Sequence, residues 1–228
     1  MATASGESFA MMSGTSMAAP HVAGVAALVK QKFRKFSLLT TYLSLGEAIM
    51  AQRAYANPDQ TLSPATPFDM GNGFVNATAA LDPGLIFDTS FEDYMSFLCG
   101  INGSAPVVFN YTGKNCLLSN ATISGSDLNL PSITVSRLNN TRTVQRLMTN
   151  IAGNETYTVS LIPPFDVLVK VSPTQFSIAS GETKVLSVIL TAKKNSSIAS
   201  FGRVKLFGTA GHVVHIPMSV TVKIASNQ

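Results

Sequence analysis

A serine that could act as a nucleophile lies near the start of this chain. Ser16 follows Gly14, a residue type that permits backbone conformations closed to others, and precedes an apolar pattern that predicts a helix from Met17 onward. With that start, Pro20 is the fourth helical residue, where its missing N–H is tolerated, and Ser16 is the cap. The serine is then either a capping hydroxyl or a nucleophile whose reaction develops negative charge at the helix N-terminus.

A serine nucleophile needs a base to take its proton, so the three histidines are the next residues to consider. His21 lies about 140° around the predicted helix from Ser16, so we expect it to be structural. His212 and His215 fall on opposite faces of one predicted strand, which makes them a poor metal site and a poor catalytic dyad. We expect both on a sandwich surface. Three carboxylates in turn settings are expected to make local hydrogen bonds: Asp69, Asp82 and Asp88.

The segment Gly-Thr-Ser-Met-Ala-Ala-Pro-His-Val-Ala-Gly at residues 14–24 resembles the nucleophile signature of subtilisin-like proteases (subtilases). The resemblance implies that Ser16 attacks the scissile carbonyl and that its amide forms part of the oxyanion hole. In that family His21 belongs to the signature and is not the base. The Asp, the His and the oxyanion Asn of subtilases precede the Ser, and residues 1–15 contain neither Asp nor His. We therefore predict that the chain is a serine endopeptidase of the subtilisin type by family, and that it is inactive as this isolated chain.

Residues 66–76 and 79–88 resemble the stretch that closes the catalytic domain in plant subtilases. The second of these stretches predicts a helix that Asp-Pro-Gly stops. Residues 37–47 depart from the family, because a Ser-Pro sequence and most of a buried helix are missing there. A deletion or a splicing difference is our hypothesis for that departure.

Residues 89–127 are predicted to be a connector with a short helix over 91–100, and the rest of it, to Ser126, is predicted to be loop. The chain then alternates apolar and polar residues, and this pattern predicts strands over 157–162, 167–171, 184–190 and 213–224. This part resembles the fibronectin type III-like domain that ends plant subtilases. The predicted fold is therefore multidomain: the C-terminal part of an α/β subtilisin-like catalytic domain (1–88), the connector (89–127) and an all-β sandwich (128–228).

Composition indicates a packed globular chain, since 46% of the residues are hydrophobic and 12% are charged. The net charge is +4, and the one basic cluster, at residues 30–35, is expected to be a solvated helix end rather than a nucleic-acid site. No apolar run is long enough to span a membrane, and the first residues lack the features of a signal peptide. No cofactor or metal is expected, and the expected partner is a protein or peptide substrate once the missing N-terminal part completes the site.

The chain carries an excess of Asn-x-Ser/Thr sequons, which favours a secreted or cell-wall protein. The seven glycosylation candidates are Asn76, Asn102, Asn110, Asn120, Asn139, Asn154 and Asn195. Cys99 and Cys116 are the only cysteines, and with the sequons they favour a disulfide. A non-catalytic β-sandwich module, left from a truncated protease, is the alternative function that the sequence leaves open.

Overall fold

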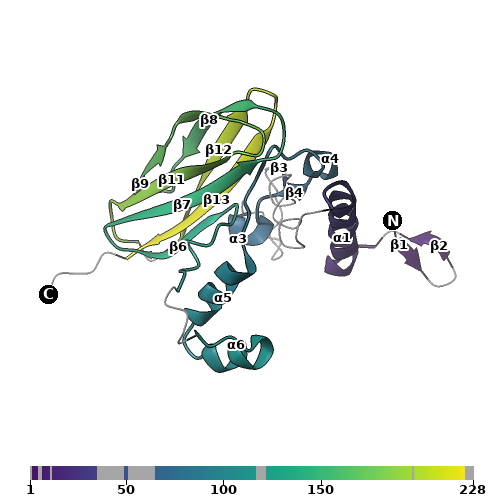
Figure 1. Cartoon of the computed structure of the whole chain (residues 1–228), viewed down its shortest axis with the longest axis horizontal. Helices are drawn as coiled ribbons and strands as arrows, with labels where there is room; N and C mark the ends of the chain where they lie inside the picture. The colour runs from purple at the N-terminus through teal and green to yellow at the C-terminus, as the bar shows by residue number, and fades with distance from the viewer. Residues whose placement is uncertain are drawn as a thin grey trace.

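The computed structural model describes residues 2–4, 7–10, 12–34, 49–50, 65–116, 122–196 and 198–223. Its largest unit is a β-sandwich, and a set of short elements precedes that sandwich along the chain (Figure 1). The departure predicted at residues 37–47 lies outside the described residues.

The sandwich consists of two sheets. The five-stranded sheet has the order β10-β8-β12-β13-β6, and the four-stranded sheet has the order β5-β7-β11-β9. Neighbouring strands are antiparallel except β6 and β13, which run parallel. The strands after the connector are β6 (Ile133–Leu138), β7 (Thr141–Asn150), β8 (Glu155–Ile162), β9 (Val167–Ser172), β10 (Gln175–Ile178), β11 (Thr183–Ala192), β12 (Ser200–Gly208) and β13 (Val213–Val222).

The predicted strands are confirmed, and their alternation explains the core. In β11 the side chains of Leu186, Val188 and Leu190 are fully buried, and in β13 those of Val214 and Ile216 are fully buried. Inward residues from both sheets join one continuous apolar cluster. Burying such alternating side chains between two sheets is the main stabilisation of a sandwich.

The strand β5 (Leu85–Ile86) extends the four-stranded sheet, although it precedes the connector in sequence. Leu85 pairs with Asn150, and Leu85 and Phe87 are fully buried in the sandwich core. The segment after the Asp-Pro-Gly turn is therefore packed as part of the sandwich. The division of the chain after residue 88 stays a sequence prediction.

The elements before β5 are short apart from one helix. They are β1 (Ala2–Ala4), β2 (Glu7–Ala10), α1 (Thr15–Lys32), β3 (Ile49–Met50), α3 (Pro67–Met70), β4 (Phe74–Val75) and α4 (Ala77–Ala80). Figure 1 shows α1 to one side of the sandwich, with α4 beside one of its ends. The predicted helix before Asp-Pro-Gly is confirmed as α4, and Asn76 caps it by accepting a hydrogen bond from the amide of Ala79.

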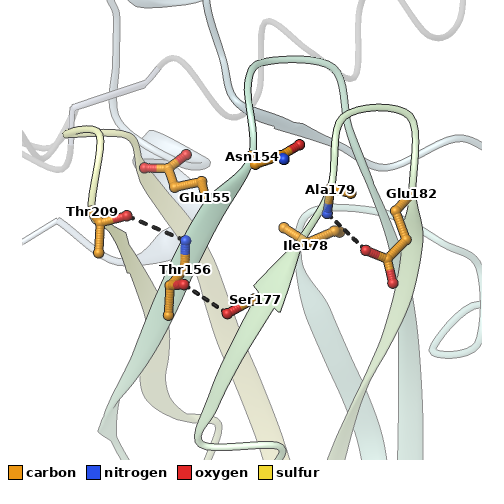
Figure 2. Close-up of a pocket in the computed structure, with 8 residues that line it drawn as sticks. All are labelled: Asn154, Glu155, Thr156, Ser177, Ile178, Ala179, Glu182 and Thr209. Carbon is orange, nitrogen blue, oxygen red and sulfur yellow. Dashed lines mark hydrogen bonds between the residues drawn. The ribbon is translucent and has the colours of Figure 1, made fainter.

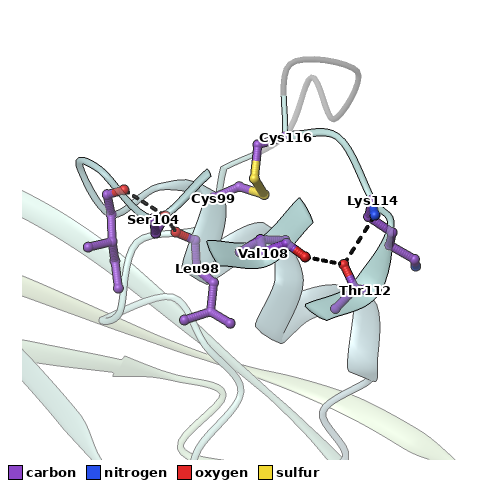
Figure 3. Close-up of a disulfide and its surroundings, with 8 residues drawn as sticks. Leu98, Cys99, Ser104, Val108, Thr112, Lys114 and Cys116 are labelled. Atoms are coloured by element: carbon purple, nitrogen blue, oxygen red, sulfur yellow. Dashed lines mark hydrogen bonds between the residues drawn. A yellow bond between two sulfur atoms is a disulfide. The ribbon is translucent and has the colours of Figure 1, made fainter. Parts of the chain in front are cut away.

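The connector contains two helices, α5 (Phe91–Cys99) and α6 (Ala105–Thr112). The expectation that everything after α5 is loop was wrong, because Ala105 and Pro106 begin α6 and Gly113, in the left-handed conformation, ends it. Figure 3 shows the disulfide between Cys99 and Cys116, which ties the end of α5 to the chain after α6. The hydroxyl of Ser104 donates to the carbonyl of Leu98 in the turn between the two helices.

Candidate functional site

Ser16 lies in the first turn of α1 and is exposed. The prediction that Ser16 caps the helix was wrong, since Gly14 is the cap and Thr15 is the first helical residue. Gly14 adopts a φ of 150°, and its carbonyl accepts hydrogen bonds from the amides of Met17 and Ala18. A residue with a side chain adopts this conformation only with strain, so the glycine lets the helix start earlier than the apolar pattern indicates.

The earlier start makes Pro20 the sixth residue of α1. Proline has no N–H, so Pro20 cannot donate the helical hydrogen bond to the carbonyl of Ser16. His21 Nδ1 lies 2.5 Å from the carbonyl oxygen of Met17 and donates to it. His21 is therefore bonded to its own helix, in agreement with its predicted structural role.

One side of α1 packs on α4. Ala26 and Val29 are buried there against Ala80. Lys32 Nζ donates to the carbonyl of Leu81 across 2.5 Å. The remaining residues of α1 are mostly exposed, Ser16 among them.

The structure does not bring a histidine or a carboxylate to Ser16 within the residues it describes. A serine at a helix N-terminus can bind an oxyanion through backbone amides. It cannot lose its own proton readily without a base. The described part of the site is therefore an exposed serine in the first turn of a helix, without the groups that would activate it.

The two C-terminal histidines differ from what the sequence predicted. His212 does not lie on a strand, because it stands in the turn between β12 and β13, and its side chain is only 14% exposed. His215 lies on β13 and is half-buried, with burial and then the charges of Lys205 and Arg203 lowering its pKa to about 4. Both expectations of a surface histidine were therefore wrong, because neighbouring segments cover the two rings.

The carboxylates of Asp69 and Asp82 contact partners of different kinds. Asp69 accepts hydrogen bonds from the amide and the hydroxyl of Thr66 in a capping box, in agreement with its predicted local role. The hydrogen bond from the Thr66 amide is the main reason that the pKa of Asp69 is lowered. Asp82 instead reaches His212, which is distant in sequence. A local role for Asp82 was wrong, and no sequence signal links its turn to the β12–β13 hairpin.

The sequon asparagines have different surroundings. The exposed ones are Asn102, Asn110, Asn139, Asn154 and Asn195. Asn76 is half-buried as the α4 cap, and Asn120 lies outside the described residues. Glycosylation at any of them stays a prediction.

Two parts of the chain match known protein families. Residues 1–73 match the subtilase family, and residues 127–220 match a fibronectin type-III domain. The chain therefore belongs to the subtilases, in the form in which a subtilisin-like segment is followed by a fibronectin type III-like sandwich.

The relatives are plant proteins. The chain is 85% identical to subtilisin-like protease SBT2.2 of Arabidopsis thaliana, and the match covers 98% of this chain and 27% of that protein. It is 67% identical to subtilisin-like protease SBT2.3 of the same plant, over 97% of this chain and 28% of that protein. The chain thus spans little more than a quarter of the length of these relatives, and it is a plant-type subtilase sequence.

Proposed function

We propose that this chain is part of a serine endopeptidase in which Ser16 is the nucleophile. The observation that carries the proposal is the exposed Ser16 in the first turn of α1, with Gly14 setting the helix start. Helix amides at that position favour negative charge on a carbonyl oxygen under attack. The subtilase match over residues 1–73 includes this serine.

The activating groups belong, in this proposal, to the part of a subtilase that the match does not cover. An Asp, a His and an oxyanion Asn that precede the Ser would complete the site. The substrate is then a protein or peptide. The isolated chain is expected to be inactive, since its described residues hold no base near Ser16.

Labelling with a fluorophosphonate probe tests this proposal. We expect no labelling of the isolated chain, and labelling of a longer protein in which an Asp- and His-bearing subtilase segment precedes it. Ser16→Ala should abolish that labelling, whereas Ser13→Ala, at another exposed serine next to the helix cap, should preserve it. Labelling that survives Ser16→Ala would assign the nucleophile elsewhere, and labelling of the isolated chain at Ser16 would show that its own residues supply a base.

An extracellular location is the second part of the proposal. The Cys99–Cys116 disulfide and the exposed sequons support it, because disulfides persist in oxidising compartments. None of the helices in the described ranges is long and apolar enough to cross a membrane. Mass spectrometry of the plant-expressed protein after enzymatic glycan release should find occupied exposed sequons and an unmodified Asn76, whose side chain caps α4.

A non-catalytic role of the sandwich is the second candidate function. The sandwich has its own continuous apolar core and holds most of the described strands, which favours a unit that folds as a binding or structural module. In a longer protein that carries the activating segment, Ser16→Ala separates the two functions, because it should remove proteolysis and leave binding by the sandwich unchanged.

A further inference from the structure

Asp82, Glu155 and His212 come from three separate segments and meet where the turn after α4 touches the sandwich. His212 Nδ1 lies 2.7 Å from Glu155 Oε2, and His212 Nε2 lies 3.4 Å from Asp82 Oδ1. Both ring nitrogens can donate only when the imidazole is protonated. The arrangement of a carboxylate at each nitrogen therefore favours the imidazolium form.

Glu155 is buried and is held in place by hydrogen bonds. The Glu155 side chain is 1% exposed, and its Oε1 accepts from the amide of Ala210 at 2.7 Å. Figure 2 shows Glu155 at the start of β8, beside the β12–β13 hairpin, where the amide of Thr156 donates to the Thr209 hydroxyl. A Cβ added at Gly208 would lie 2.0 Å from Glu155 Oε1, so only glycine leaves room for this carboxylate.

The other side of the cluster depends on a second glycine. Gly84 has a φ of +74°, and a Cβ there would lie 2.7 Å from His212 Cγ and 2.7 Å from the Tyr157 hydroxyl. Its carbonyl accepts from the amide of Ile151 at 2.9 Å. The backbone of the turn after α4 therefore lies directly on the His212 ring.

The same turn, together with α4, contacts the helix α1, which carries Ser16. Leu81, next to Asp82, accepts the hydrogen bond from Lys32 at the end of α1. Ala80 is buried against α1. A contact that holds Asp82 against the sandwich therefore also holds α4, and through α4 the helix α1.

We propose that Asp82, His212 and Glu155 form a proton-operated latch between the α1–α4 segment and the sandwich. The latch is closed while His212 carries its second proton. Loss of that proton removes the charge attraction to both carboxylates and leaves one ring nitrogen without a hydrogen to donate. The segment that carries α1 is then held less firmly. This inference does not depend on Ser16 being a nucleophile.

The charges around His212 give the latch its pH range. Among the described residues, the ionisable groups that face the ring are Glu155 and Tyr157 of β8 and Asp82 of the turn. Burial acts to lower the pKa of His212, but the hydrogen bond and charge of Glu155, followed by those of Asp82, outweigh burial and raise it. Burial likewise acts to raise the pKa of Glu155, but hydrogen bonds from Tyr157, His212 and the Ala210 amide lower it.

The direction of the effect follows from these two shifts. A histidine whose pKa is raised on folding contributes stability that is present below its unfolded pKa, near 6.5, and is lost as the pH rises through the folded pKa. Glu155, whose pKa is lowered, stays ionised until the pH falls below its ordinary value of 4.5. The latch is therefore closed in mildly acidic solution and opens towards alkaline pH.

Two measurements on the whole chain test the latch. Histidine NMR should give His212 a titration midpoint above 6.5, with His215 in the same spectrum titrating near 4. Asp82→Asn should lower the His212 midpoint, and the exposed Asp82 side chain makes this variant compatible with folding. Amide hydrogen exchange of residues 77–86, normalised to the unfolded peptide, should become several-fold faster as the pH rises through the His212 midpoint.

The controls distinguish a latch from a merely structural histidine. Asp82→Asn and His212→Gln should each flatten the pH dependence of exchange at residues 77–86, whereas Glu92→Gln, at an exposed carboxylate elsewhere, should not. A His212 midpoint at or below 6.5 would overturn the proposal. So would a midpoint that Asp82→Asn leaves unchanged, or exchange at residues 77–86 that does not follow the midpoint.

Discussion

A single buried side chain, that of Arg146 on β7, links the end of the connector to the sandwich. Arg146 is 1% exposed, and its guanidinium donates to four backbone carbonyls, which belong to Ser126, Leu130, Ser132 and Gln145. Burial lowers its pKa to about 10, so it stays protonated at neutral pH. A buried cation satisfied by carbonyls alone depends on all of these bonds, because none of its direct partners is an anion.

Arg146→Lys should therefore destabilise the chain by about 2–4 kcal/mol, because an ammonium cannot reproduce the planar set of donors and leaves buried carbonyls unpaired. Urea unfolding measures this loss. Arg142→Lys is the matched control, since the Arg142–Asp127 ion pair is partly exposed and should change the unfolding free energy by less than about 1 kcal/mol. Equal losses in both variants would contradict this role of Arg146.

The half-buried His215 should give a pH effect opposite to that of His212. Its pKa is lowered to about 4, first by burial and then by Lys205 and Arg203, while the unfolded histidine titrates near 6.5. Between these two values the unfolded chain binds more protons, so stability falls as the pH falls from 6.5 towards 4. Urea unfolding across this range should show that His215→Gln removes part of the loss. The same pH dependence in His215→Gln and in the wild type would contradict this contribution of His215 to the loss of stability.

At the scale of elements, the two helices of the connector depend on covalent and local contacts more than on a core. α5 has no buried residue, and Val108 is the one buried residue of α6. At the end of α6 the Thr112 hydroxyl donates to the carbonyl of Val108 and accepts from the backbone amide of Lys114 (Figure 3). The disulfide joins Cys99, at the end of α5, to Cys116, which follows α6 and lies 17 residues further along the chain.

Removing the disulfide with Cys99→Ser and Cys116→Ser should loosen α6 without unfolding the sandwich. A loop of this length is stabilised by roughly 3 kcal/mol when it is closed. Hydrogen exchange should accelerate in residues 105–112 and stay unchanged in β11 and β13. Slow exchange in α6 of the double variant would show that packing, rather than the bridge, orders this helix.

At the scale of the whole molecule, the sandwich is completed by residues from before the connector. Phe87 is fully buried in its core, and β5 forms one edge of its four-stranded sheet. The segment that precedes the connector is therefore joined to the sandwich through a shared core and not only through the chain. The His212 cluster lies at the same joint.

Phe87→Ala should lower the unfolding free energy of the sandwich by about 3–5 kcal/mol, the usual cost of emptying a buried aromatic site. Phe91→Ala is the control, since Phe91 is 57% exposed and only four residues further on. Thermal unfolding monitored by near-ultraviolet circular dichroism compares the two. A midpoint unchanged by Phe87→Ala would mean that the sandwich folds without this segment.

The sequence by itself determined the family and the strands β8, β9, β11 and β13, and it singled out Ser16 as the candidate nucleophile. Alternating residues such as Leu186, Val188 and Leu190 specify a strand locally, because side chains of a strand point to opposite faces in turn. The signature around Ser16 is likewise contiguous. Asp69 was predictable for the same reason, because a capping box lies within four residues.

Only the tertiary structure decided which distant segments meet. Asp82 and His212 are local in appearance and are 3.4 Å apart in the fold, and Phe87 belongs to a core formed by strands far along the chain. The start of α1 also depended on the backbone of Gly14, which the apolar pattern does not record. Such contacts depend on how whole elements pack, so no run of neighbouring residues carries them.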